Sequence, residues 1–134
     1  MLSGTSVTFK FYLYEADGKN LANMQILYIQ KENDASVNNV EMRKGTKFML
    51  KTKNDEIIEF VAEESQNSRS KLSRYKNNQF SLSAEINRDQ IQLLTENPVT
   101  MYRVVPEGFK TLSGDVSKRR GRKMMEQILC FTKK

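Results

Sequence analysis

Residues 117–132 read SKRRGRKMMEQILCFT, and this stretch decides how the rest of the chain is interpreted. Its apolar and small side chains recur at steps of three and four residues, which places them along one face of an α-helix. Asp115 or Ser117 is the expected N-cap. Such a helix is stable only when its apolar face is covered, so the upstream residues should form the surface on which it packs. The expected stripe consists of Gly121, Met124, Met125, Ile128, Leu129 and Thr132.

The first two turns of this helix carry a basic run that accounts for much of the net charge of +6. The basic run consists of Lys118, Arg119, Arg120, Arg122 and Lys123. Cations at a helix N-terminus are unfavourable by a few tenths of a kcal/mol each, because the helix dipole is already positive there. A bound phosphate or carboxylate would relieve this repulsion. The basic run is therefore the main candidate for partner binding, and a solvated face that keeps the protein soluble is the alternative.

Composition excludes several kinds of chemistry. The chain has 134 residues, which fits a single domain at residues 1–134, and it contains no histidine and one cysteine, Cys130. These counts remove the commonest general base, the Ser-His and Cys-His pairs, and the usual zinc ligand sets. The adjacent acids at 55–56 and 63–64 fall at strand ends, where neighbours point to opposite faces. We therefore expect no enzymatic activity, no cofactor and no metal site.

The chain contains no segment that predicts a membrane span. No apolar run reaches the roughly 20 residues that a membrane helix needs, and no signal peptide precedes the first strand pattern. A single cysteine fits a reducing compartment, so a cytoplasmic location is favoured. A location in the cell envelope is the alternative if a signal segment has been removed.

Strand patterns fill most of the first two thirds of the chain. Residues on the two faces alternate within 7–14 and within 21–30, and Asp17-Gly18 lies between these two stretches. This pattern predicts a tight hairpin. Residues 47–53 and 56–63 predict a second hairpin, preceded by a short strand at 40–42. Further strands are expected at 79–86, 99–105 and 109–112. Asn87 and Gln90 form a capping-box pattern for a short helix that ends near Thr95.

Two further patterns have both a structural and a functional interpretation. Residues 65–78 are polar and contain Arg69 and Arg74, which predicts a mobile loop; an exposed connection is favoured over a basic binding loop. Four tyrosines on predicted strands suit ordinary packing on a pleated sheet better than a stacking surface for bases. These are Tyr12, Tyr14, Tyr28 and Tyr102.

The order of elements predicts an α+β fold. We expect a mostly antiparallel curved sheet, one short helix, and a C-terminal amphipathic helix packed on the sheet. A β-sandwich of the transthyretin type is the second choice, indicated by the pattern of residues 14–21. The long final helix counts against it.

The last third of the chain resembles a group of small, mostly uncharacterised bacterial domains. Their pattern is Ile-x-x-x-Gln-Ile/Leu-x-x-Leu, then Pro/Gly-Val-x-x-x-Arg in a strand, then a basic amphipathic helix. The matching residues are Ile86, Gln90, Ile91, Leu94, Pro98, Val99 and Arg103. The resemblance implies an α+β fold and no activity. This chain departs from the pattern at residues 107–109, where those domains continue a regular hairpin.

Three hypotheses about function follow. The favoured one is a non-catalytic binding or accessory domain that contacts a protein or an anionic polymer through the basic run. The second is a nucleic-acid-binding protein whose phosphate contacts come from Arg119, Arg120, Arg122, Lys123, Arg69 and Arg74. The sequence shows no helix-turn-helix and no paired exposed aromatic residues, which weakens this second hypothesis. The third is an enzyme that uses carboxylates.

Overall fold

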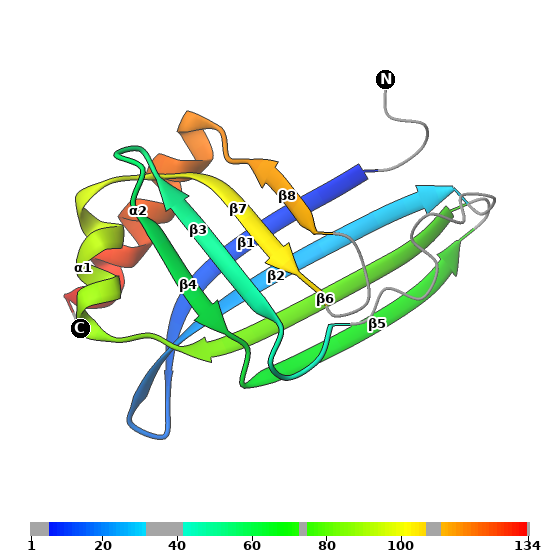
Figure 1. The fold of residues 1–134 in the computed structure, drawn as a ribbon, viewed down its shortest axis with the longest axis horizontal. Helices are drawn as coiled ribbons and strands as arrows, with labels where there is room; N and C mark the ends of the chain where they lie inside the picture. The colour runs from blue at the N-terminus through cyan, green and yellow to red at the C-terminus, as the bar shows by residue number, and fades with distance from the viewer. Residues whose placement is uncertain (1–5, 32–41, 73–74, 107–110, 134) are drawn as a thin grey trace.

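The computed structural model describes residues 6–31, 42–72, 75–106 and 111–133 of the chain (Figure 1). Within these residues it contains eight strands and two helices. They are β1 (Ser6–Ala16), β2 (Lys19–Lys31), β3 (Lys47–Thr52), β4 (Ile57–Val61), β5 (Glu64–Leu72), β6 (Tyr75–Glu85), α1 (Arg88–Glu96), β7 (Val99–Val105), β8 (Leu112–Asp115) and α2 (Lys118–Thr132). The α+β class with antiparallel strand pairing is confirmed.

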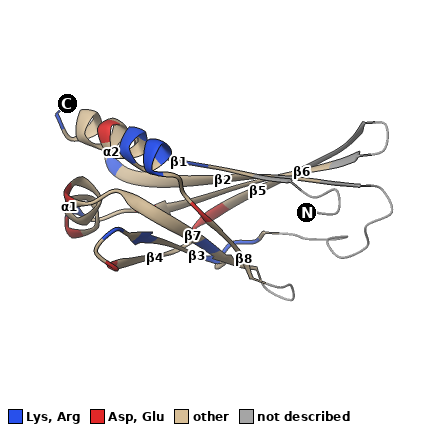
Figure 2. Ribbon diagram, turned by 90° about the horizontal axis from the view of Figure 1, so that it is seen from above, with Lys and Arg blue, Asp and Glu red and all other residues tan. Residues whose placement is uncertain are grey.

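The strands form two sheets where the sequence predicts one. Their orders are β1-β2-β6-β5 and β4-β3-β7-β8, and Figure 2 shows them as separate layers. The chain changes sheet at two consecutive residues. The Ala62 N–H donates to the Thr46 carbonyl beside β3 at 2.9 Å, whereas the Glu63 N–H donates to the Ser83 carbonyl of β6 at 2.7 Å. This layering is closer to the sandwich considered as second choice, with α1 and α2 added.

The inner faces of the two sheets share one hydrophobic core. Phe9 of β1 stacks on Tyr102 of β7 with ring centroids 4.2 Å apart, and Phe11 lies 6.1 Å from Phe60 of β4. Phe48 of β3 stacks on Phe60 at 4.9 Å. Burying a side chain of this size contributes roughly 1.5–3 kcal/mol. The period-two pattern of the strands therefore supplies the apolar surface that holds the layers together.

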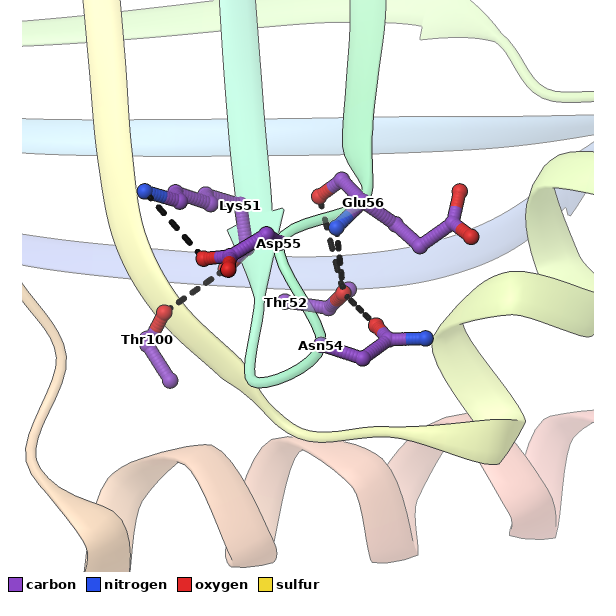
Figure 3. A network of polar contacts seen from close by, with 6 residues as sticks. All are labelled: Lys51, Thr52, Asn54, Asp55, Glu56 and Thr100. Carbon is purple, nitrogen blue, oxygen red and sulfur yellow. Dashed lines mark hydrogen bonds and ion pairs between the residues drawn. The ribbon is translucent and has the colours of Figure 1, made fainter.

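Two predicted turns are confirmed. Asp17 and Gly18 join β1 to β2 with φ of 52° and 75°, as a type I′ turn requires. Figure 3 shows the β3–β4 turn, where Asp55 has φ of 66° and its carboxylate pairs with Lys51 at 3.4 Å. The Thr52 N–H donates to the Glu56 carbonyl at 2.9 Å and closes this turn. Asp55 and Glu56 are thus part of the turn.

The prediction of a loop at residues 65–78 is wrong. Residues 65–72 belong to β5 and residues 75–78 to β6, and the two strands pair from Glu64↔Ser83 to Leu72↔Tyr75. The backbone makes these ladder hydrogen bonds whatever the side chains are, so a polar composition did not prevent a strand. Arg74 lies outside the described residues.

Other boundaries also differ from the sequence prediction. The last strand is β8, Leu112–Asp115, instead of residues 109–112, and residues 109 and 110 lie outside the described part. For the strand expected at 40–42, only Met42 is described, and it lies outside any strand. Both its backbone groups pair with the Asn67 side chain, from N–H to Oδ1 and from Nδ2 to the carbonyl, each at 2.8 Å.

The two helices begin at the predicted caps. Asn87 and Gln90 form the capping box of α1, and the Ser117 hydroxyl accepts from the Arg120 N–H at 3.2 Å. Buried Gly121, Met124 and Ile128 face the protein, so the stripe is narrower than expected. Helix α2 contacts β1 of one sheet, β7 of the other, and α1. It therefore lies against both layers.

Gly121 allows α2 to pack closely against β7. A Cβ atom at position 121 would lie 2.6 Å from the Val99 carbonyl oxygen, which belongs to the backbone and has little room to move. Gly→Ala in a helix interior normally adds about 1 kcal/mol of stability. We predict that Gly121→Ala instead lowers the free energy of unfolding by about 1–3 kcal/mol, through overpacking.

Urea unfolding measures this effect, with Cys130→Ala as the matched control. Cys130 is exposed on the same helix, so its replacement should change stability by less than about 0.5 kcal/mol. A stabilised Gly121→Ala variant would show that α2 does not approach β7 as described.

Candidate functional site: a basic groove between α2 and β1

A groove with a volume of about 600 Å³ lies between the start of α2 and β1. It is lined by Phe9, Lys10, Phe11, Tyr12, Tyr102, Asp115, Val116, Arg120, Lys123, Met124 and Gln127. We call it the basic groove. Figure 2 shows the blue first turns of α2 beside β1. Of the residues that line it, Lys10, Arg120 and Lys123 are cationic and only Asp115 is acidic.

The basic groove follows the open edge of β1. Neighbouring residues of a strand point to opposite faces of its sheet, so a cavity that touches only one face meets every second residue. Residues 9–12 all line this groove, although Phe9 and Phe11 are buried and Lys10 and Tyr12 are exposed. The groove therefore lies beside the strand, where β1 ends the sheet order.

The cations of the groove are exposed and lack ion pairs. Within the described residues, salt bridges join Lys47 to Glu59 and Lys51 to Asp55, on the other sheet. No hydrogen bond or ion pair engages the side chains of Lys10, Arg120 or Lys123 in the described part of the chain. These cations are available to an anionic ligand.

Tyr102 links the groove to the core. Its ring is buried and stacks on Phe9 with an interplanar angle of 2°. Burial raises the pKa of the Tyr102 phenol above its ordinary value of 10.0, and the positive charge of Arg120 partly lowers it. Gly114 makes room for this ring, because a Cβ atom there would lie 2.6 Å from the phenol oxygen.

The structure separates the residues predicted as one site. Arg120 and Lys123 line the basic groove, whereas Lys118, Arg119 and Arg122 are exposed on α2 and do not line it. Arg69 lies in β5, at the opposite edge of the sheet from β1, so it is not in the groove. The basic run is thus divided between one wall of the groove and the outer surface of the helix.

Sequence reasoning missed Lys10, Tyr12 and the edge of β1. The alternation of residues 7–14 already placed Lys10 and Tyr12 on one face of a strand. Nothing in that pattern shows that β1 ends a sheet beside α2. Long-range pairing decides this, and the sequence pattern does not encode it.

The tyrosines do not form a common surface. Tyr12 and Tyr14 lie 5.9 Å apart on the outer face, and the Tyr14 hydroxyl donates to Ser83 Oγ at 3.2 Å. Tyr102 faces the core, and the side chain of Tyr28 lies outside the described part. Among the tyrosines whose side chains are described, Tyr12, at 41% exposed, is the one that lines the groove as an exposed ring.

A second cavity of about 730 Å³ lies between α1, the end of α2 and the β1–β2 hairpin. Its lining includes one cation, Arg88, and one acid, Glu15, with no paired carboxylates. In the described part of the chain, no group of three His, Cys, Asp or Glu residues could hold a metal ion. Among the described residues, the lining of each of these two cavities thus contains a single acid.

No helix in the described residues is both long and apolar enough to span a bilayer. Comparison of the chain with protein-family models, curated proteins and solved structures found no match.

The raised pKa of Tyr102 predicts a pH dependence of stability. The folded state favours the neutral phenol, so its contribution is complete below pH 10.0 and is lost as the pH rises above that value. In this window the unfolded chain releases the proton first, and stability falls by at most about 1.4 kcal/mol per pH unit for this group.

Urea unfolding between about pH 9 and about pH 11 measures this slope. Tyr102→Phe removes the titrating group, so its stability should fall less steeply than that of the unchanged protein. Arg120→Gln removes the charge that opposes the shift, and should extend the window to higher pH. Equal slopes for the unchanged protein and Tyr102→Phe would contradict the assignment.

Proposed function

We propose that this chain is a non-catalytic binding domain that holds an anionic partner, a protein or an anionic polymer, in the basic groove. The observation that carries the proposal is the position of Arg120 and Lys123. Both line a groove of about 600 Å³ together with Lys10, and no acid of the described chain pairs with them.

The helix end is electrostatically suited to an anion. The first turn of α2 contains no acidic residue, although acids are the favoured residues there. The Ser117 hydroxyl caps the Arg120 N–H, and the Ser117 carbonyl accepts from the Gly121 N–H at 2.8 Å. A carboxylate or phosphate in the groove would offset the repulsion between the helix dipole and the basic run.

The positions of the acids support a non-catalytic role. Asp55 pairs with Lys51 in a turn, and Glu63 Oε2 accepts from the Glu85 N–H at 3.1 Å. Their carboxylates thus contribute to local structure at separate places in the fold. This arrangement favours binding over acid–base chemistry.

Nucleic-acid binding is the second candidate, favoured by the exposed cations of α2. Lys118, Arg119 and Arg122 lie outside the groove and could contact phosphates together with Arg120 and Lys123. Such binding would depend steeply on salt, because each phosphate contact releases counterions. Dependence on both sets of cations would distinguish this candidate.

Fluorescence anisotropy with labelled polyglutamate, single-stranded DNA and RNA, at low and at physiological salt, tests the proposal. Arg120→Gln with Lys123→Gln removes the cations of the groove. Arg119→Gln with Arg122→Gln removes the same charge from the outer surface and is the matched control. We predict that the first pair weakens polyglutamate binding at least about tenfold more than the second, a difference of about 1.4 kcal/mol.

Each other outcome has a defined meaning. Equal weakening by the two pairs, with nucleic acid bound more tightly than polyglutamate, would favour the second candidate. Failure of every polyanion to bind at low salt would contradict an anion-binding role. Circular dichroism of both pairs shows that they remain folded, which is expected because the four residues are exposed.

A further inference from the structure

We propose that the partner in the basic groove is an acidic polypeptide segment in extended conformation, which pairs with β1 as an added strand. This inference rests on the proposed function and specifies its partner. It starts from the edge of β1, a feature separate from the charges of α2.

The backbone of Phe9 and Phe11 points its N–H and C=O groups away from β2. The hairpin has a two-residue turn closed by the pair Ala16↔Lys19, and hydrogen-bonded pairs then alternate with non-bonded ones along the strands. The backbone N–H and C=O groups of residues 16, 14, 12 and 10 of β1 therefore form hydrogen bonds with β2. Residues 15, 13, 11 and 9 point their backbone groups to the open edge.

A contact on the far side of β2 supports this alternation. Asn20 lies opposite Glu15, and by the same alternation these two residues form no backbone hydrogen bonds with each other. The Asn20 carbonyl should therefore point away from β1, and it accepts from the Ile86 N–H at 3.0 Å. The backbone groups of Glu15 and of the alternate residues Phe11 and Phe9 consequently face the other way, toward the open edge of β1, and Phe9 and Phe11 do so beside the groove.

These edge groups have no partner in the described chain. β1 pairs with β2 alone, and no further hydrogen bond engages the backbone of Phe9 or Phe11 in the described part. Unpaired edge groups beside a groove are a template for an incoming strand, which pairs through its own backbone. Residues 9 and 12 lie about 10 Å apart along the strand, because three steps of about 3.4 Å separate them.

The mixture of donors and acceptors selects a polypeptide. A phosphate or other simple anion accepts hydrogen bonds, so the carbonyl oxygens of Phe9 and Phe11 would repel it. An extended peptide offers an N–H and a C=O at every second residue toward β1, and satisfies both kinds of group. The edge therefore matches a strand better than a small anion or a nucleic-acid backbone.

The charges of the groove select an acidic segment. Lys10 is exposed on β1 between Phe9 and Phe11, and Arg120 and Lys123 lie on the α2 side of the groove. Side chains of an added strand alternate between faces, so carboxylates at every second residue would lie beside Lys10. Main-chain pairing would give affinity, and these cations would select for carboxylates.

The test uses a capped peptide of alternating glutamate and valine, with a lysine–valine peptide as the charge control. Two further peptides carry N-methyl groups either on every glutamate or on every valine. Each N-methyl removes a donor without changing charge. We expect one methylated peptide to bind at least tenfold more weakly and the other to bind nearly as well as the parent, because alternate N–H groups face β1.

Amide hydrogen exchange identifies the paired residues on the protein. In the complex, the N–H groups of Phe9 and Phe11 should exchange at least tenfold more slowly. The N–H groups of Lys10 and Tyr12 already bond to β2 and serve as internal controls. Arg120→Gln with Lys123→Gln should weaken the parent peptide more than Arg119→Gln with Arg122→Gln does.

The outcomes separate this inference from the proposed function. Equal binding of the two methylated peptides, with unchanged exchange at Phe9 and Phe11, would overturn strand addition while leaving an anion-binding groove. Equal binding of the lysine–valine peptide would overturn the selection for acidic partners. Failure of polyglutamate and of the peptide to bind would overturn both proposals.

Discussion

The close contact between Gly121 and the Val99 carbonyl fixes the position of α2, and the basic groove depends on that position. A side chain at residue 121 would lie 2.6 Å from the Val99 backbone oxygen, so α2 can approach β7 this closely only because residue 121 is glycine. Arg120 and Arg122 flank the contact in sequence. Since neighbours on a helix are about 100° apart, one of them turns to the groove and the other to the outer surface. The glycine within the basic run thus divides the cations.

The open edge of β1 is a hazard that α2 partly covers. An edge strand with unpaired backbone groups can pair with another chain, and proteins commonly protect it with charge or with a helix. Here α2 contacts β1, yet a groove of about 600 Å³ remains beside residues 9–12. Lys10 adds a positive charge at the same edge. Under the proposed strand pairing, this arrangement would favour an acidic strand over neutral or basic ones, because an acidic strand would bring charges that match the cations.

Local features of the fold were predictable from the sequence, and long-range ones were not. The Asp17-Gly18 turn, the Asn87–Gln90 capping box and the Ser117 cap depend on neighbouring residues, and each lies where the sequence places it. The split into two sheets depends on the change of hydrogen-bond partner between Ala62 and Glu63, which no local pattern marks. The β5 strand was missed because its polar side chains resemble a loop, although its backbone pairs fully with β6.

The candidate site shows the same division. The basic run was evident from composition, but its separation into Arg120 and Lys123 on the one hand and Arg119 and Arg122 on the other follows from the approach of α2 to β7. Lys10 and the backbone of Phe9 and Phe11 join these cations only because β1 ends its sheet. The resemblance of the last third to small bacterial domains stays a prediction, because the comparisons found no match against which it could be tested.

Tyr102 connects the groove with the stability of the core. Its ring stacks on Phe9, whose backbone forms part of the open edge, and its phenol lies close enough to Arg120 for that charge to affect its pKa. A ligand that draws Arg120 toward a carboxylate would weaken the charge felt by Tyr102, so the pKa of the phenol would rise further. Because the same ring packs against β8 at Gly114, a shift of β1 on strand pairing would be transmitted to both sheets. Under the proposed strand pairing, binding at the groove would therefore be coupled to packing of the core through the Tyr102 side chain.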